Sequence, residues 1–370
     1  MAPESSALPA LQLNANASSD RTVYDLLMAN RLSCVLTVAV QMRVFDAMQT
    51  KGPMTRAALV AHAGVTLRGA HAMLIALYAA QLLVLDPSGA SDPQHADARF
   101  MPSPTAATYL VESSPAYLGY LVEMDGDDFL TPEKLRHALT SAKPTVYGAT
   151  DPWAEQGKDP VKAERFTRGM RSISTEPARA LAEHVLMKGP DAPTAVLDVA
   201  GGSGVHVGAL LSAHSDRTAT ILELQSTLET TTAYLASLPE AVRRRVSYRP
   251  GDMFTDSWPT ADPNSGRAFD AILLSQILHD WAPRECGLLI KKAFETLPAG
   301  GRVLVYEKLV DDDCRGPLMT AMVNLDMLMW TEGQQFTPSL LRDLLQAGGF
   351  TDVATHSTTG YWSVTVARKP

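Results

Sequence analysis

The residues best suited to chemistry follow short apolar stretches that are typical of buried strands. Residues 198–204, Asp-Val-Ala-Gly-Gly-Ser-Gly, end such a stretch and precede a helical pattern. Backbone N–H groups in a glycine loop can approach a ligand closely, and the start of the next helix favours negative charge. Glu223 follows Gly204 by nineteen residues. Its carboxylate can accept hydrogen bonds from both hydroxyls of a ribose; the alternative is an ordinary turn with a chance acidic residue.

The spacing of the glycines narrows the class of ligand. Dinucleotide-binding loops carry a third glycine where this chain has Val207, and no Gly-Lys-Ser/Thr sequence of a phosphate-binding loop follows. A nucleoside without phosphate but with a carboxylate-bearing tail fits better, and S-adenosylmethionine is such a molecule. We therefore expect S-adenosylmethionine as the cofactor. Its predicted binding residues in this region are Asp198, Gly201, Gly202, Gly204 and Glu223.

A further segment, residues 249–254, follows the third apolar stretch of this region. Asp252 in it can accept a hydrogen bond from an adenine amine, and Met253 can pack on the face of the ring. Taken alone, Asp252 would be interpreted as a turn aspartate beside core residues. Together with the glycine loop, the two residues are predicted to contact the cofactor.

His279 lies just beyond the fourth apolar stretch, residues 271–274. Open α/β sheets bind ligands at the carboxyl ends of their strands. Histidine can take a proton from a phenol near neutral pH, which is typically worth about 10²–10⁴ in rate. Glu307, at the end of the next predicted strand, could hold the imidazole in the correct tautomer. The alternative is a structural histidine that caps the turn formed by residues 281–285.

Composition bounds the class of protein. The chain has 370 residues, is 46% hydrophobic and 19% charged, and carries a net charge of −8. These values fit a globular protein of about two domains and disfavour binding to nucleic acid or anionic membranes. The three cysteines are far apart, and the nine histidines form no His-Glu-x-x-His pair, so we expect neither disulfides nor a metal site. Without a secretory signal or a long continuous apolar run, a cytoplasmic location is predicted.

Composition and the pattern of apolar residues divide the chain into four predicted segments. Residues 1–20 are predicted to be a flexible leader, and residues 21–110 follow a helix, turn, helix and hairpin order that is typical of a winged helix. Residues 22–48 are apolar on more than one face, which favours burial against a partner subunit. Residues 111–185 form a helical linker region. Residues 186–370 alternate strand and helix, which predicts an α/β domain with a doubly wound, mostly parallel sheet.

These segments together resemble a known family, the small-molecule O-methyltransferases of the plant caffeate and animal acetylserotonin type and their microbial natural-product relatives. The likeness runs from about residue 22 to the C-terminus. The matching stretches are Leu-Asp-Val-Ala-Gly-Gly-Ser-Gly (197–204), Gly-Asp-Met-Phe (251–254), Leu-His-Asp-Trp (278–281), Arg-Gly-Pro-Leu (315–318) and Thr-Glu-Gly-Gln (331–334).

The resemblance implies a winged-helix dimerisation domain followed by a Rossmann-like S-adenosylmethionine-binding domain. It implies a homodimer that methylates a small aromatic metabolite. By this likeness His279 is the base and Glu307 its partner, while Ser275 and Gln276 border the cofactor. Phe166 and Met170 would line the substrate cavity.

The chain departs from the family pattern at two positions. Gln335 stands where relatives often carry a glutamate on the second side of the histidine, and a neutral amide cannot stabilise an imidazolium as a carboxylate does. Asp326 stands where some relatives carry a substrate-pocket asparagine. A buried carboxylate needs a cationic or hydroxyl partner, so the sequence points to an acceptor with an amine or several hydroxyls. A solvated helix residue is the alternative for Asp326.

Three other functions remain open at this point. Methylation of carbon or nitrogen would use the same donor site, and a dehydrogenase on the same sheet is disfavoured by Val207. A winged-helix regulator with a ligand-sensing domain would need a basic DNA-binding surface. Residues 1–120 hold seven Lys/Arg against eight Asp/Glu, and the expected recognition helix, residues 67–83, carries only Arg68 and His71 as basic residues.

Overall fold

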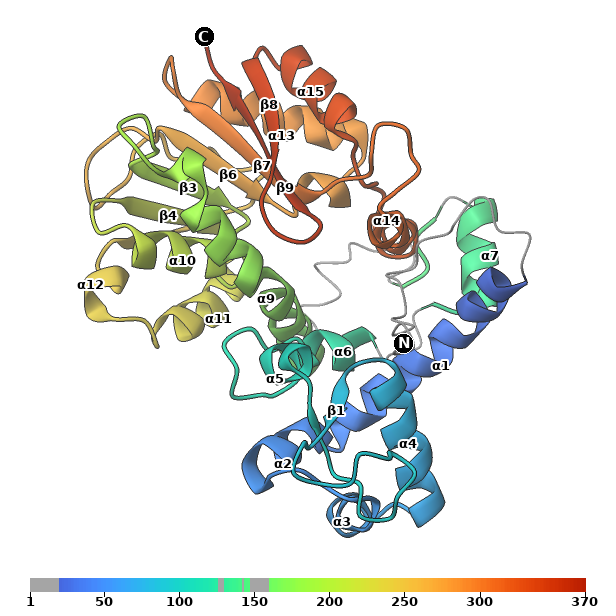
Figure 1. Ribbon diagram of the computed structural model, residues 1–370. Helices are drawn as coiled ribbons and strands as arrows, with labels where there is room; N and C mark the ends of the chain where they lie inside the picture. The colour runs from blue at the N-terminus through green and yellow to red at the C-terminus, as the bar shows by residue number, and fades with distance from the viewer. Residues whose placement is uncertain (1–19, 126–129, 142, 147–159) are drawn as a thin grey trace. The chain divides into compact units, whose positions relative to one another are not determined.

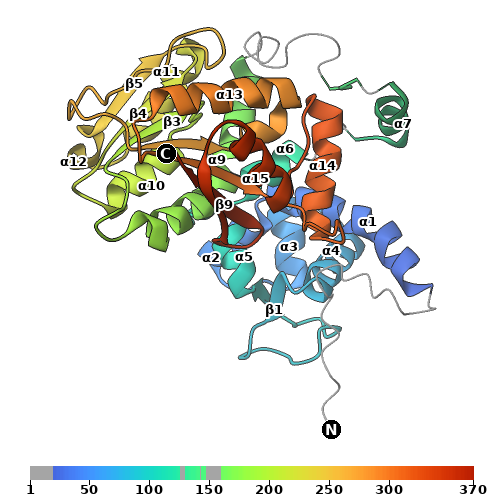
Figure 2. The same ribbon diagram turned by 90° about the horizontal axis from the view of Figure 1, so that it is seen from above.

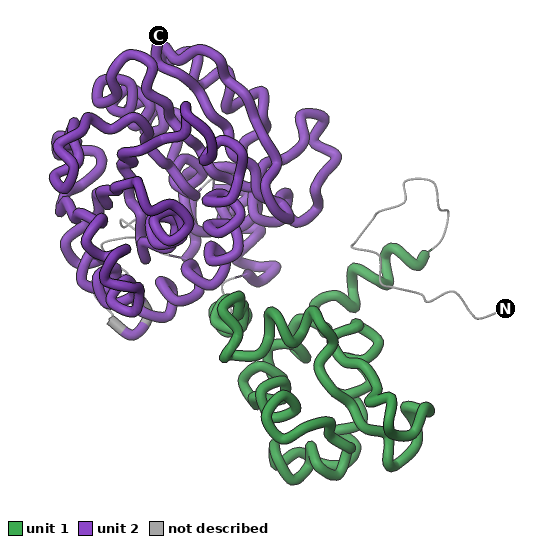
Figure 3. The backbone as a smooth tube through the Cα atoms, turned by 60° about the vertical axis from the view of Figure 1, so that its left-hand side comes forward, with its two compact units in different colours: residues 1–128 green, residues 129–370 purple. Residues whose placement is uncertain are grey.

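The computed structural model describes residues 20–125, 130–141, 143–146 and 160–370. Two compact units divide the chain, residues 1–128 and residues 129–370, shown in green and purple in Figure 3. The predicted leader lies outside the described residues except for Asp20. The finer division of the chain into four segments stays a prediction.

The first unit is helical with one small hairpin. Its elements are α1 (Arg21–Gln41), α2 (Val44–Lys51), α3 (Arg56–Ala63), α4 (Leu67–Ala79), β1 (Leu83–Leu85), β2 (Phe100–Pro102), α5 (Pro104–Tyr109) and α6 (Gly119–Asp125). Helix α3 begins at Thr55, whose side chain accepts a hydrogen bond from the Ala58 N–H, and ends at Gly64 in the left-handed region with φ +67°. Strands β1 and β2 pair antiparallel, which completes the helix–turn–helix–hairpin order expected from the sequence.

Most of the apolar surface of helix α1 is not covered by the part of the chain that the structure describes. Only Ala39 and Val40 are buried, and its exposed large residues include Tyr24 and Leu27. By length and composition alone, this 21-residue helix could cross a membrane. The sequence analysis did not detect this, because it considered only continuous apolar runs. The same composition suits a helix that packs against another subunit.

In the described part of the second unit, a seven-stranded sheet has the order β5-β4-β3-β6-β7-β9-β8. The strands are β3 (Ala195–Val199), β4 (Thr218–Glu223), β5 (Val246–Pro250), β6 (Ala271–Ser275), β7 (Arg302–Lys308), β8 (Thr351–Ser357) and β9 (Trp362–Arg368). The neighbouring strands from β5 to β7 pair parallel, and β9 joins β7 antiparallel. This confirms the predicted α/β fold with a doubly wound, mostly parallel sheet.

Helices cover both faces of the sheet (Figures 1 and 2). The helical elements are α7 (Pro132–Ser141), α9 (Pro160–Glu183), η1 (Val185–Met187), α10 (Val205–Ala213), α11 (Gln225–Leu235), α12 (Glu240–Arg243), η2 (Leu278–Asp280), α13 (Pro283–Thr296), α14 (Leu318–Trp330) and α15 (Pro338–Ala347). One hydrophobic core joins the sheet to α13 and α15, with Leu289 and Leu341 fully buried. The other joins it to α9, α10 and α11, with Leu211 fully buried. The sequences of the strands between the two cores are nearly continuous apolar runs, because helices cover both faces of the sheet.

Asp270 ties the starts of two central strands together. Its carboxylate accepts hydrogen bonds from the Thr194 N–H at 2.8 Å, the Thr194 hydroxyl at 2.7 Å and the Ala195 N–H at 3.0 Å. Because β3 and β6 are neighbours, these bonds fix the amino ends of the strands that carry the glycine loop and His279.

We expect Asp270→Ala to lower the free energy of unfolding by about 1.5–3 kcal/mol, since hydrogen bonds to a charged acceptor contribute about that much. Urea denaturation followed by circular dichroism measures the change. Asp191→Ala, at an exposed position before β3, is the matched control. Equal stability of the two variants would contradict the role of Asp270.

Candidate active site

The candidate site residues lie at the carboxyl edge of the parallel strands. Residues 198–204 follow β3 directly, Glu223 ends β4, and His279 lies four residues after the end of β6. In the sheet β3 lies between β4 and β6, and β7 lies next to β6. The topology therefore brings together side chains that are up to about a hundred residues apart in the sequence, at the edge where open α/β sheets bind ligands.

The glycine loop adopts a backbone that other residues would strain. Gly202 and Gly204 have φ values of +53° and +69°. A Cβ on Gly201 would lie 2.7 Å from Asp198 Oδ2, and one on Gly204 would lie 2.9 Å from Leu235 Cδ1. Glycine is therefore required for the left-handed turns and for the close approach of the loop to β3 and α11.

Glu223 lies against this loop. Its Oε2 accepts the Gly202 N–H at 3.0 Å, and its Oε1 accepts the Leu224 N–H at 2.7 Å. Burial raises the pKa of this carboxyl, while the two backbone N–H groups oppose the shift. Each oxygen keeps a second lone pair, so the geometry leaves room for the diol contact predicted from the sequence.

Asp198 supplies a test of whether the site fits a cationic cofactor. Its side chain is fully buried, and neither carboxyl oxygen has a hydrogen-bond partner among the described residues. Burial, together with the charge of Glu223, raises its pKa to about 8. A buried carboxyl without a partner suits a bound cation, and S-adenosylmethionine carries an ammonium and a sulfonium. The residues present therefore fit this cofactor.

Asp252 and Met253 follow β5 in a tight turn. Asp252 Oδ1 accepts the Phe254 N–H at 2.7 Å, and the Met253 carbonyl accepts Lys292 Nζ at 2.6 Å and Trp258 Nε1 at 2.9 Å. This is the turn geometry that the plainer interpretation expected. Contact of either residue with an adenine ring stays a prediction.

Ser275 ends β6 and Gln276 follows it, and both contact residues that the sequence analysis did not select. The Ser275 hydroxyl lies 3.2 Å from His206 Nε2, on the first turn of α10. Burial lowers the pKa of His206 to about 4, so its imidazole is neutral. The pair joins the glycine-loop helix to the strand that leads to His279. The sequence signal that could have identified His206 as a site residue is its position two residues after Gly204.

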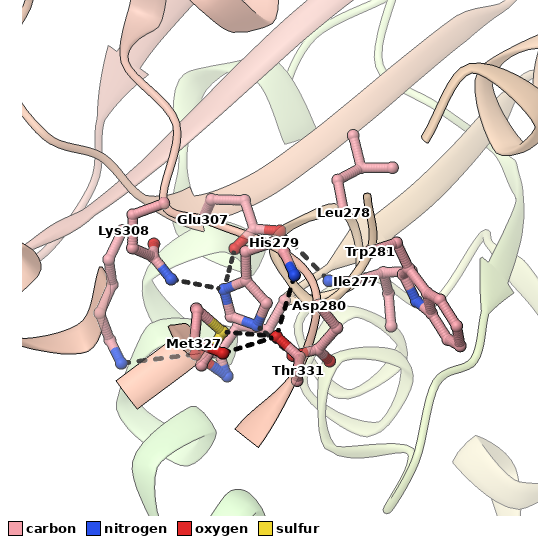
Figure 4. A network of polar contacts seen from close by, with 12 residues as sticks. Ile277, Leu278, His279, Asp280, Trp281, Glu307, Lys308, Met327 and Thr331 are labelled. Carbon is pink, nitrogen blue, oxygen red and sulfur yellow. Dashed lines mark hydrogen bonds and ion pairs between the residues drawn. The ribbon is translucent and has the colours of Figure 1, made fainter. Parts of the chain in front are cut away.

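His279 lies in the short helix η2 and is held between carboxylates (Figure 4). Its Nδ1 lies 2.9 Å from Glu307 Oε2, and its Nε2 lies 3.5 Å from Asp280 Oδ1. Glu307 is fully buried at the end of β7, and its Oε1 accepts the Ile277 N–H at 3.2 Å. The structure thus brings together the two residues that the sequence paired as base and partner.

These carboxylates control the protonation of His279. Burial lowers the pKa of the imidazole, but the charges of Glu307 and Asp280 outweigh burial and raise it to about 9, against an opposing effect of Lys308. Without ligands these carboxylates therefore favour the imidazolium form of the ring. Only the neutral ring can accept a proton, so positive charge near His279 favours its basic form.

Gln335 occupies the second side of the same nitrogen. The side-chain amide nitrogen Nε2 of Gln335 lies 2.9 Å from His279 Nδ1, and Oε1 has no hydrogen-bond partner among the described residues. The backbone N–H of Gln335 donates to Asn324 Oδ1 at 2.8 Å. An Nδ1–H that donates to Glu307 cannot also accept from an amide N–H. Rotating the amide by 180° presents Oε1 to Nδ1–H and satisfies both groups, and this is the orientation we assign.

Two further residues fix the turn that carries His279. The buried Cys286 thiol lies 3.2 Å from the Leu278 carbonyl and 3.3 Å from the Trp281 carbonyl, and burial raises its pKa to about 12, so it donates as a neutral S–H. A Cβ on Gly333 would lie 1.9 Å from the His279 carbonyl oxygen. Only glycine allows this approach of the two backbones.

The predicted substrate residues lie on two helices of the second unit. Phe166 on α9 packs near Trp330 on α14, with ring centroids 6.5 Å apart. Met170, one helical turn after Phe166, is half-buried, and so is Asp326 on α14. Asp326 and Lys308 interact electrostatically. No contact described for Met170 joins it to His279, so its place in a substrate cavity stays a prediction. Within the described ranges, no group of three or more His, Cys, Asp or Glu side chains could hold a metal ion.

Two family models match the chain. An O-methyltransferase domain matches residues 133–351, and an O-methyltransferase dimerisation domain matches residues 24–112. These matches show that the chain is a methyltransferase, so the regulator and the dehydrogenase that the sequence left open are no longer needed as interpretations.

Individual relatives agree with the family models. The acetylserotonin O-methyltransferase of Bos taurus is 28% identical over 91% of this chain and 94% of its own length. The 3-hydroxy-5-methyl-1-naphthoate 3-O-methyltransferase of Streptomyces sahachiroi is 30% identical, covering 86% of each chain. The crystal structure of human N-acetylserotonin methyltransferase in complex with SAM matches with a TM-score of 0.82 at 23% identity, over 96% of this chain and 99% of that one. The chain therefore belongs to the O-methyltransferase family, as an S-adenosylmethionine-dependent O-methyltransferase that carries the family's dimerisation domain.

Proposed function

We propose that the enzyme transfers a methyl group to a hydroxyl of a small aromatic metabolite, with His279 as the general base. The observation that carries this proposal is the buried His279–Glu307 pair, with Nδ1 and Oε2 2.9 Å apart at the ligand-binding edge of the sheet. Bound S-adenosylmethionine supplies a methyl group on a sulfonium. Asp198, Glu223 and the glycine loop would hold it, with Asp252, Met253, Ser275 and Gln276 at its border.

The chain's own residues then have distinct tasks. Glu307 accepts the Nδ1–H of His279 and keeps the proton on that nitrogen, so Nε2 is the nitrogen that takes the proton of the acceptor hydroxyl. Gln335 accepts the same Nδ1–H without adding negative charge, which keeps the pKa of the imidazole lower than a second carboxylate would. Cys286 and Gly333 fix the orientation of the turn. Because methyl transfer needs an in-line approach, orientation supplies the larger share of the rate enhancement.

The acceptor class follows from the predicted substrate residues and from the relatives. Phe166 and Met170 offer apolar contacts to an aromatic ring. The relatives are O-methyltransferases of acetylserotonin, of a hydroxynaphthoate and of tetracenomycin polyketide synthesis, which supports a place in secondary metabolism. Asp326 is proposed to contact acceptor hydroxyls or an amine, although Lys308 already offers it a cation within the chain.

We also propose that the enzyme acts in the cytoplasm as a homodimer through residues 22–48. The dimerisation-domain match supports a homodimer. The exposed apolar side chains of α1 provide the surface, since Leu27 is 61% and Tyr24 59% exposed in the single chain. A surface of this kind is normally covered by protein.

We expect His279→Ala to lower turnover by about 10²–10⁴-fold and to leave the affinity for S-adenosylhomocysteine unchanged. A methyl-transfer screen over phenols, aromatic amino acids and quinones, with NMR assignment of the methylated atom, first identifies an acceptor. Turnover of the variant on that acceptor, and calorimetric binding of S-adenosylhomocysteine, then test the base. Unchanged turnover would show that His279 is not the base, and methylation at carbon or nitrogen would replace the hydroxyl acceptor.

The pH dependence of activity tests the role of Gln335. We expect Gln335→Glu to move the acidic limb of the kcat/KM profile to higher pH by about one unit or more, since an adjacent carboxylate favours the imidazolium. At neutral pH the variant is slower, and the difference shrinks as pH rises. Gln334→Glu, at the neighbouring exposed position, adds the same charge and should leave the limb in place. An equal shift of the acidic limb in both variants would show that the effect does not come from the contact between residue 335 and His279.

The oligomeric state tests the role of α1. Multi-angle light scattering at micromolar concentration should give a dimer for the wild type and a folded monomer for Leu27→Glu, because a buried carboxylate opposes association. Leu139→Glu replaces an equally exposed leucine, 63% exposed on α7, and should remain dimeric. A monomeric wild type would rule out this interface.

A further inference from the structure

Lys308 is a buried cation that the mechanism above does not use. It is the last residue of β7 and is 4% exposed. Among the described residues, its Nζ makes a single hydrogen bond, 3.4 Å to Gln276 Oε1, and it has no carboxylate within ion-pair distance. The ring of Trp362 lies beneath it, with 5.0 Å between Nζ and the ring centroid. An ammonium has three N–H donors, so two remain for a ligand.

The burial of this lysine needs a reason. Lysine normally extends its ammonium to water, and it is almost never fully buried without a partner. Burial lowers the pKa of Lys308 to about 8, while the charges of Glu307 and Asp326 raise it. Two carboxylates in its surroundings keep the ammonium largely charged at neutral pH, although neither neutralises it by direct contact.

Lys308 belongs to the shell of residues around His279. It directly follows Glu307, which holds the imidazole, and its hydrogen-bond acceptor Gln276 precedes His279 by three residues. Its charge opposes protonation of His279, and Asp326, with which it interacts, lies next to Met327 on α14. In Figure 4 the Lys308 side chain extends from β7 in the left half of the view, where Met327 also lies.

We propose that Lys308 binds a carboxylate of the methyl acceptor, so that the enzyme acts on hydroxylated aromatic acids. This inference rests on the proposed function and names its substrate class. The ammonium supplies two charge-assisted donors, Gln276 orients it from one side, and the Trp362 ring supports it from below. The carboxylate anchors the acceptor while the hydroxyl reaches His279.

A competing role for the same cation is to bind the carboxylate of the cofactor. The two roles differ in which affinity depends on Lys308. Cofactor binding would make the affinity for S-adenosylhomocysteine depend on the ammonium. Acceptor binding would leave that affinity unchanged and would affect only acidic acceptors.

The experiment measures binding of 3-hydroxy-2-naphthoate and of its neutral carboxamide by calorimetry, with the full-length enzyme saturated with S-adenosylhomocysteine. The variants are Lys308→Met, which keeps the length of the side chain and removes the charge, and Lys308→Arg, which keeps the charge. Lys291→Met, on an exposed lysine of α13, is the matched control. We expect the wild type, the Lys308→Arg variant and the control to bind the acid about 10-fold or more tightly than the amide.

In Lys308→Met the preference for the acid should vanish, while the affinities for the amide and for S-adenosylhomocysteine stay unchanged. Raising the pH from about 7 to about 9.5 should weaken binding of the acid to the wild type, because Lys308 loses its charge in that range. Glu307, Asp326 and His279 face the same ammonium, and His279 titrates in the same window. Lys308→Arg corrects for its effect, because arginine keeps its charge over this range while His279 still titrates.

Three outcomes would overturn the proposal. They are an acid preference that survives in Lys308→Met, a wild type that does not bind the acid more tightly than the amide, and a loss of S-adenosylhomocysteine affinity in Lys308→Met. Failure of the wild type to bind S-adenosylhomocysteine or to methylate any phenol would instead contradict the proposed function. The two failures are therefore distinguishable.

Discussion

A buried imidazole between carboxylates is the constraint on which the rest of the site depends. An unpaired charge inside a protein is very costly, so His279 and Glu307 stabilise each other only while their geometry is held closely. The Ile277 N–H, the Cys286 thiol and the backbone approach at Gly333 all act on the turn that carries the imidazole. Much of the local structure therefore serves to keep one nitrogen next to one carboxylate oxygen.

The sheet links the position of His279 to the part of the site where the glycine loop lies. Parallel register aligns Ser275 with Tyr306, so that β6 and β7 end together and place His279 and Glu307 at one edge. The Ser275–His206 contact joins the same edge to the helix that follows the glycine loop. Because both faces of the sheet are covered by packed helices, a shift of either strand end would disturb a hydrophobic core as well as the site.

Charge within the site follows a consistent pattern. Asp198 and Glu223 place two buried carboxyl groups beside the glycine loop, and a cationic cofactor would favour their ionised forms. Around His279, by contrast, Lys308 and the neutral Gln335 limit the effect of Glu307 and Asp280 on the imidazole. The sequence presented Gln335 as a departure that weakened the mechanism. In the structure the amide satisfies the imidazole N–H while adding no charge that would hold the base in its protonated form.

The sequence alone determined the fold class, the glycine loop and the pairing of His279 with Glu307, because these depend on local pattern. Short apolar runs predict strands, and residues that follow parallel strands must meet at one edge. It did not select His206, Cys286, Gly333 or Lys308, because what distinguishes each of them is a contact with another segment of the chain. It also treated every apolar stretch as too short to cross a membrane, because the apolar residues of α1 are interrupted by polar ones and match a span only when the whole 21-residue helix is counted. Only tertiary structure decides which side chains are buried together, and burial is what shifts the pKa values and leaves the Lys308 ammonium with donors to spare.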